Sequence, residues 1–83
     1  MKVAVRYFAS VREALGSGEQ VEVPPGTTVG AVRDALIARD VAHATALGRG
    51  RAVRSALDPV LCDERAVVAE GAEVGFFPPV TGG

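Results

Sequence analysis

The sequence is 83 residues long, is 48% hydrophobic, and has a formal net charge of −1 from nine basic and ten acidic residues. A chain of this length forms one domain with a small core, and its hydrophobic content is sufficient for that core. The balanced charge gives no electrostatic argument for binding nucleic acid or an anionic membrane.

The N-terminal segment predicts a strand followed by a short helix. Residues 1–8 alternate polar and apolar side chains, with Val3 and Val5 on one face, which is typical of a half-buried strand. Residues 9–15 place their apolar side chains at helical spacing, and Ser10 is a candidate cap for the start of that helix.

A second strand and the main helix come next. Residues 19–23 alternate polar and apolar side chains and end at a Pro-Pro-Gly turn. Thr27 and Thr28 are candidate N-caps for a helix that runs to about Arg39 or Asp40. Its apolar stripe consists of Val29, Val32, Leu36 and Ile37, and the charged side chains Arg33, Asp34 and Arg39 take the remaining faces.

The middle of the chain carries the weakest pattern. Residues 41–50 predict a loop that could contain a helical turn at 42–47, with His43 exposed. Arg49, Arg51 and Arg54 surround a glycine. They could form a solvated edge or a docking patch for an acidic partner, and pairing in the folded state could neutralise them.

The last third predicts two strands, at residues 52–57 and 60–62, joined by a turn at Asp58-Pro59. Residues 66–68 are expected to pack back onto the domain before a tight turn at Glu70-Gly71. The final strand, around Val74 and Phe76, is the most apolar, so we expect it to lie centrally and parallel to the first strand. One main helix packed across a mixed sheet satisfies this order of elements.

The ending of the sequence is its most informative stretch. Pro78-Pro79 stops the final strand, because proline cannot donate to a ladder and holds φ near about −65°. Val80, Thr81, Gly82 and Gly83 follow. Glycine permits close backbone approach, and the prolines limit the conformations that docking must remove. The two glycines alone would equally fit a flexible end, but the whole stretch favours a reactive Gly83 carboxylate that another protein activates.

No other chemical motif is evident. The sequence contains no Gly-rich phosphate loop, nucleophile elbow, metal-spaced His/Cys set, paired carboxylates or RNA-binding aromatic signature. Its single cysteine, Cys62, excludes an intramolecular disulfide, and a nucleophile–base pair of Cys62 and His43 has no supporting motif. We therefore expect a carrier with no independent active site, cofactor or metal. The short apolar run at the N-terminus argues against a signal peptide or membrane span, so a cytoplasmic location is expected.

Two stretches resemble the small, sulfur-carrier subunits of molybdopterin synthase, which belong to the ubiquitin-like β-grasp superfamily. The ending from Glu70 to Gly83 is similar to that family's C-terminus almost throughout, and Tyr7–Gly16 is similar to its first-strand-to-helix segment. The family commonly has an asparagine where this chain has Asp58. The resemblance implies an α+β, β-grasp fold with a mixed sheet of four to five strands on one main helix. Residues 1–83 would be one domain, with 78–83 as a protruding tail.

The resemblance also implies a reaction cycle. An E1-like enzyme adenylates the Gly83 carboxylate with ATP, and a sulfur donor such as a cysteine desulfurase converts it to a thiocarboxylate. The tail then inserts into the large subunit of a heterotetramer, and sulfur passes to cyclic pyranopterin monophosphate. Gly82 and Gly83 are the implied covalent site. The implied partner-binding residues are Phe76, Phe77, Pro78, Pro79, Val80 and Thr81, although at least one phenylalanine could belong to the core.

Two other classes of function remain open from the sequence. The chain could be a ubiquitin-like modifier conjugated to lysines, or a sulfur carrier for thiamine, cysteine or tRNA thiolation. It could also be an interaction module in which the Gly-Gly ending is incidental.

Overall fold

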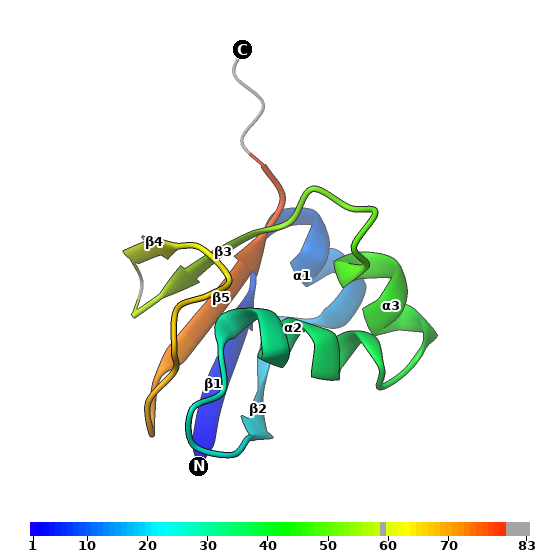
Figure 1. Cartoon of the computed structure of the whole chain (residues 1–83). Coiled ribbons are helices and arrows are strands. Elements are labelled where there is room, and N and C mark those ends of the chain that lie inside the picture. The colour runs from blue at the N-terminus through cyan, green and yellow to red at the C-terminus, as the bar shows by residue number, and fades with distance from the viewer. Residues whose placement is uncertain (59, 80–83) are drawn as a thin grey trace.

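A five-stranded mixed sheet forms the frame of the protein, with the strand order β2-β1-β5-β3-β4 (Figure 1). The computed structural model describes residues 1–58 and 60–79. Its strands are β1 (Lys2–Tyr7), β2 (Gly18–Glu22), β3 (Arg54–Leu57), β4 (Val60–Cys62) and β5 (Glu73–Phe77). β5 pairs in parallel with β1 and antiparallel with β3. The prediction that the final strand is central and parallel to the first is therefore confirmed.

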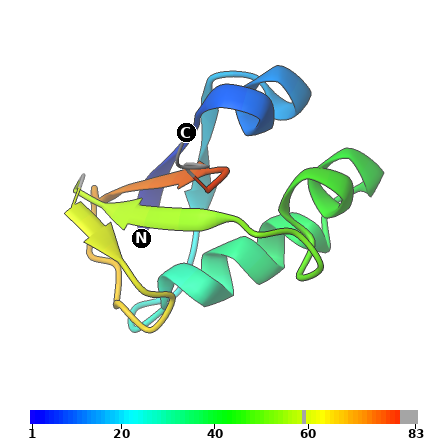
Figure 2. The ribbon, with the colours of Figure 1, turned by 90° about the horizontal axis from the view of Figure 1, so that it is seen from above.

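Three helices accompany the sheet: α1 (Ala9–Leu15), α2 (Val29–Ile37) and α3 (Val41–Leu47). Seen from above, α2 lies along one side of the sheet and α3 follows at its end (Figure 2). Nine large side chains between these elements are almost fully buried: Val3, Val5, Tyr7, Val29, Val32, Leu36, Leu47, Val74 and Phe76. Alternate residues of a strand face opposite sides of the sheet. The side chains that face this core are therefore the odd-numbered apolar residues of β1 and the even-numbered apolar residues of β5. Among the described residues, no helix is long and apolar enough to cross a membrane.

The starts of the two predicted helices differ in how they are capped. The Thr28 hydroxyl accepts a 3.1 Å hydrogen bond from the Ala31 amide, so the cap predicted for α2 is confirmed. The prediction that Ser10 caps α1 is wrong. Phe8 occupies the N-cap position and provides no side-chain hydrogen bond, because the helix begins at Ala9, one residue too early for the hydroxyl to act.

The middle segment, for which we predicted a loop that could contain a helical turn at 42–47, forms helix α3 over Val41–Leu47. Asp40 caps α3 by accepting a 2.8 Å hydrogen bond from the His43 amide, and Leu47 anchors the other end with 0% exposure. The predicted exposure of His43 is wrong: its side chain is only 12% exposed, because it lies between two carboxylates.

β3 is shorter than the predicted strand at 52–57, whereas β4 has the predicted bounds Val60–Cys62. β3 begins at Arg54, and residues 66–68 contribute only an isolated bridge between Val67 and Thr28. Asp58 ends β3 with a positive φ of 54°, and its carboxylate accepts a 2.7 Å hydrogen bond from the Glu73 amide. Asparagine and aspartate tolerate this left-handed conformation better than most residues. The expected turn is thus held by Asp58, while Pro59 lies outside the described residues.

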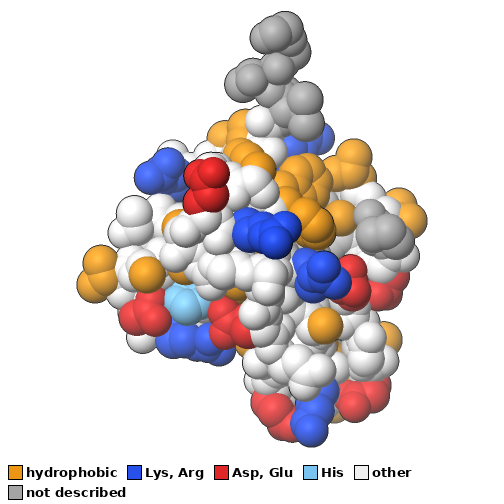
Figure 3. All heavy atoms as spheres, turned by 180° about the vertical axis from the view of Figure 1, so that it is seen from behind, with side chains coloured by type: hydrophobic (Ala, Val, Ile, Leu, Met, Phe, Trp, Pro, Cys, Tyr) orange, Lys and Arg blue, Asp and Glu red, His pale blue; other side chains and the backbone are white. Residues whose placement is uncertain are grey.

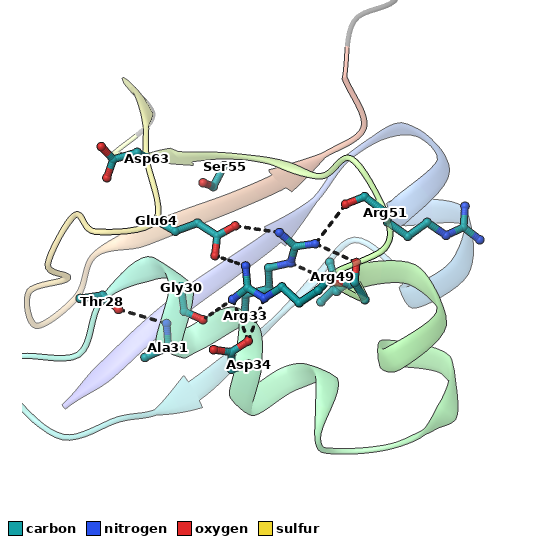
Figure 4. Close-up of polar contacts among 12 residues, drawn as sticks. Thr28, Gly30, Ala31, Arg33, Asp34, Arg49, Arg51, Ser55, Asp63 and Glu64 are labelled. Atoms are coloured by element: carbon teal, nitrogen blue, oxygen red, sulfur yellow. Dashed lines mark hydrogen bonds and ion pairs between the residues drawn. The ribbon is translucent and has the colours of Figure 1, made fainter.

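A buried arginine joins α2 to the loop after α3 (Figure 4). Arg33 is 4% exposed, which corrects the prediction that it occupies an outward face of the helix. Its Nε donates to the Leu47 carbonyl at 2.7 Å, and one Nη donates to the Gly48 carbonyl at 2.9 Å. The other Nη pairs with Glu64 at 2.7 Å. The Arg33 guanidinium thus contacts the backbone carbonyls of Leu47 and Gly48 and the carboxylate of Glu64. None of the buried side-chain polar atoms of the described residues lacks a hydrogen-bond partner.

The three neighbouring arginines have different environments. Arg49 pairs with Asp34 at 2.7 Å and also with Glu64, which confirms for this residue that pairing neutralises the cluster. Arg51 donates through Nε to the Thr45 carbonyl at 3.1 Å. Arg54 belongs to β3 and is exposed. The three arginines therefore do not form one patch: Arg49 joins the ion pairs of Asp34 and Glu64, Arg51 contacts α3, and Arg54 lies on the sheet.

Candidate functional site

The sequence-predicted site residues lie on both faces of β5 and beyond its end. Phe76 has 0% exposure and packs in the core, whereas Phe77 points to the other face and is half-buried. Pro78 and Pro79 follow the strand and are half-buried. Val80, Thr81, Gly82 and Gly83 lie outside the described residues, and so does the predicted covalent site. Only the base of the predicted tail can be placed.

The outer face of the sheet, opposite α2, carries small and apolar side chains near that base. Val74 and Phe76 are buried toward the core, so Gly75 and Phe77 face outward. Ala56 of β3 is the register partner of Gly75 and also of Leu61 in β4. Gly75, Ala56 and Leu61 therefore form one row across three strands, and Leu61 is 61% exposed.

Phe8 covers the row from the end of β1. A Cβ atom placed on Gly75 would lie 3.0 Å from the Phe8 ring, so the glycine leaves the space that the ring occupies. The rings of Phe8 and Phe77 meet edge to face, with centroids 6.4 Å apart. Phe8 nevertheless remains 43% exposed.

These five residues, Phe8, Ala56, Leu61, Gly75 and Phe77, are called the outer patch below. Figure 3, which views the molecule from behind, shows hydrophobic side chains gathered on this side of the sheet with basic side chains beside them. An exposed apolar surface rimmed by charge is typical of a protein-binding site. Sequence reasoning missed Phe8 and Leu61, although the glycine in the most apolar strand signalled that another group approaches there.

Two hollows lie on the surface, one of them at the base of the tail. A groove between α1 and α3 reaches the prolines and is lined by Ser10, Val11, Ala46, Val53, Pro78 and Pro79 among others. A wider hollow of about 490 Å³ is lined by residues 53–55 and 61–64 and touches the outer patch at Leu61. Both are open surface depressions, which suits contact with another protein better than enclosure of a small substrate.

The structure does not bring together the residues of a catalytic centre at these hollows. Cys62 lies on β4 with its Sγ 4.0 Å from the Ser55 hydroxyl, whereas His43 contacts Glu19 and Asp40. The nucleophile–base pair considered from the sequence therefore does not form. In the described part of the chain, no group of three or more His, Cys, Asp or Glu side chains could hold a metal ion.

Comparison with known proteins establishes the family. The sequence matches the model of the ThiS family over residues 5–83, which is nearly its whole length. The chain belongs to the ThiS family. One relative of this ThiS-family chain is the molybdopterin synthase sulfur carrier subunit of Escherichia coli K12. It is 36% identical over 81 residues, and the alignment covers 98% of this chain and 99% of the relative. The resemblance to that carrier family is confirmed.

Solved structures agree with the fold of the ThiS-family chain. SAMP1, the small archaeal modifier protein 1 of Haloferax volcanii, superposes with a TM-score of 0.80 at 27% identity, with 100% of both chains covered. A ubiquitin from Caldiarchaeum subterraneum gives a TM-score of 0.60 at 22% identity, covering 100% and 98%. A chain from the complex of subunits 1 and 2 of the Helicobacter pylori molybdopterin-converting factor superposes with a TM-score of 0.70 at 23% identity. The superposition covers 100% of the present chain and 100% of that chain. The predicted ubiquitin-like β-grasp fold is therefore confirmed.

Proposed function

We propose that this ThiS-family chain is the sulfur carrier of a molybdopterin synthase. The observation that carries the proposal is the 36% identity to the Escherichia coli sulfur carrier subunit over nearly the full length of both proteins. The sequence ending supports it, because Gly82 and Gly83 have no Cβ atom that would obstruct the approach of another protein to the Gly83 carboxylate. The chain itself would act as a substrate that is loaded and unloaded by other proteins.

The proposed chemistry takes place at Gly83. Its carboxylate oxygen attacks the α-phosphorus of ATP in an E1-like enzyme, and pyrophosphate leaves. The persulfide of a donor such as a cysteine desulfurase then attacks the acyl carbon and displaces AMP. A thiol cleaves the resulting S–S bond, forming a disulfide with the donor and leaving the thiocarboxylate on Gly83. The resulting thiocarboxylate delivers sulfur to cyclic pyranopterin monophosphate in the large subunit. The acyl-adenylate and the 1-thioglycine are covalent states of Gly83, so the carrier needs no resident cofactor for this cycle.

The outer patch is the surface that we propose contacts the large subunit. It lies on the outer face of the strand that leads directly into Pro78 and Pro79, so a partner seated there would receive the tail. Aromatic side chains that are already ordered lose little entropy on binding, and the edge-to-face contact orders Phe8 and Phe77 in this way. The Helicobacter pylori neighbour, a complex of two subunits, is consistent with a heteromeric assembly.

Intact-mass measurement tests the carrier function directly. The protein is incubated with its host's activating enzyme, ATP and a sulfur source, and a reaction without ATP serves as the control. The expected product is heavier by the difference between one sulfur and one oxygen atom, located at Gly83 by fragmentation. An unchanged mass, with the same enzyme active on another carrier, would overturn the proposal.

A charge placed on the outer patch is expected to weaken binding to the large subunit. Leu61 is 61% exposed on an edge strand, so Leu61→Asp should leave the fold stable while introducing a carboxylate that must be desolvated at the interface. We expect the dissociation constant, measured by isothermal titration calorimetry, to rise by roughly tenfold or more. Val41→Asp is the matched control, since Val41 is 81% exposed on α3. Equal binding by both variants would exclude the patch from the interface.

One observation favours a second function. The SAMP1 likeness covers the whole chain, and that neighbour's name describes a modifier. A chain conjugated to lysine would leave isopeptide-linked Gly83 on other proteins in a lysate of the host. Peptide sequencing of such linkages separates the two functions, because a dedicated sulfur carrier returns as the free chain after each transfer.

A further inference from the structure

The single histidine of the chain bridges two carboxylates. His43 Nε2 lies 2.8 Å from Glu19 Oε2, and Nδ1 lies 2.7 Å from Asp40 Oδ1. Tyr7 donates its hydroxyl to the same Glu19 oxygen at 2.7 Å, and Arg39 pairs with the other Glu19 oxygen. These five residues are called the His43 clasp. Figure 3 shows the pale blue histidine between acidic side chains, with basic side chains below it.

The geometry of the clasp defines the charge on the imidazole. An ionised carboxylate can only accept hydrogen bonds, so each ring nitrogen needs its own hydrogen for both contacts to form. A neutral imidazole carries one N–H, and its other nitrogen would then face a carboxylate with a lone pair. With Glu19 and Asp40 ionised, the arrangement favours the imidazolium form of His43, because each ring nitrogen can then donate to a carboxylate.

The clasp joins the β1–β2 pair to α3, which itself has little buried surface. Glu19 belongs to β2, Tyr7 to β1 and His43 to α3. Asp40 is the N-cap residue of α3. Leu47 is the one residue of α3 that is buried. A helix with so little buried surface depends on other contacts for its position, since local stability follows buried area. The clasp is the main polar connection between α3 and the β1–β2 pair.

We propose that the charged His43 side chain holds α3 against β1 and β2, and that α3 loosens when His43 loses its proton. Ala46 of α3 lines the groove that reaches Pro78 and Pro79, so one wall of the surface at the base of the tail becomes pH-dependent. The groups that face the imidazole are Tyr7 from β1, Glu19 from β2, Arg39 from the turn before α3 and Asp40 from its cap.

The expected direction of the pH effect follows from these contacts. Burial alone would lower the pKa of His43, but the hydrogen bonds to Glu19 and Asp40 outweigh it and raise the pKa above its ordinary value of 6.5. A group with a raised folded pKa stabilises the fold fully below about 6.5 and loses that contribution as the pH rises through the folded value. Burial would raise the pKa of Glu19, but hydrogen bonds from Tyr7, His43 and Arg39 lower it, so the acceptor stays ionised throughout this range.

NMR titration of the full chain tests the clasp. The pKa of His43 is expected to lie above 6.5 and to fall in Glu19→Gln, because the amide that replaces the carboxylate carries no charge. Asp40→Asn should lower it as well while keeping the oxygen that caps α3. Glu22→Gln removes the same charge from an exposed position on β2 and is expected to leave the pKa of His43 unchanged.

Hydrogen exchange provides the readout that distinguishes a clasp from a mere charge effect. The protection factors of the α3 amides, residues 41–47, should fall severalfold relative to those of α2 when the pH rises through the measured pKa of His43. In Glu19→Gln this pH dependence should largely disappear. A His43 pKa at or below 6.5, or α3 protection that is constant relative to α2 across the titration, would overturn the proposal.

Discussion

A chain carrying one added alanine after Gly83 is expected to lose sulfur loading completely while folding normally. The added residue displaces the terminal carboxylate by about 3.5 Å, whereas reacting groups must be held within roughly 0.5 Å of their productive position. The addition also converts the Gly83 carboxylate into a peptide carbonyl, which cannot attack ATP. Intact mass after incubation with the activating enzyme, ATP and sulfur source measures the loading, and urea denaturation measures the free energy of unfolding.

A second variant separates the position of the carboxylate from the bulk around it. Gly83→Ala keeps the carboxylate at the same place in the chain and adds only a methyl group. We expect partial loading of this variant and none of the extended chain. Loading of the extended chain at the rate of the unaltered protein would refute a reactive group at Gly83, and the fold would remain that of a ThiS-family protein.

The sheet and the main helix could be predicted because their signals are local. The alternation in β1 and β5 assigns alternate side chains, such as Val5 and Val74, to the core face. Thr28 marks the start of α2 with its hydroxyl. α3 was predicted only as a possible helical turn at 42–47, because its pattern is short and its position depends on distant groups. Its cap is local, at Asp40, but the contact from His43 to Glu19 comes from another part of the sheet and no periodicity reveals it.

The sequence identified site residues that are neighbours along the chain, but not those that the pairing of distant strands brings together. The sequence singled out Phe76 and Phe77 together, but strand alternation sends Phe76 into the core and leaves Phe77 outside. Phe8 comes from the opposite end of the chain and lies over Gly75 because β1 and β5 are parallel neighbours. Arg33 was assigned to an outward face because helix periodicity carries no information about a loop that later covers it.

That covered arginine leads to the largest stability effect that we expect. Arg33→Met should lower the free energy of unfolding by about 3 kcal/mol, because it removes a buried guanidinium and leaves two carbonyl acceptors without their donor. The carbonyl oxygens of Leu47 and Gly48 lose their donors, and Glu64 retains only Arg49. The effect is large because a small domain has only about 5–15 kcal/mol in total.

Urea denaturation at a constant slope measures this effect, with an exposed arginine as the matched control. The Arg65 side chain is 92% exposed and pairs with Asp63 at 3.5 Å, so Arg65→Met should change the stability by about 1 kcal/mol or less. The contrast between the two substitutions isolates burial, because both remove one guanidinium and one ion pair. If Arg33→Met were as mild as Arg65→Met, methionine packing would have compensated for the lost hydrogen bonds. The contacts of Arg33 with Leu47, Gly48 and Glu64 would then position the loop after α3 without stabilising the fold.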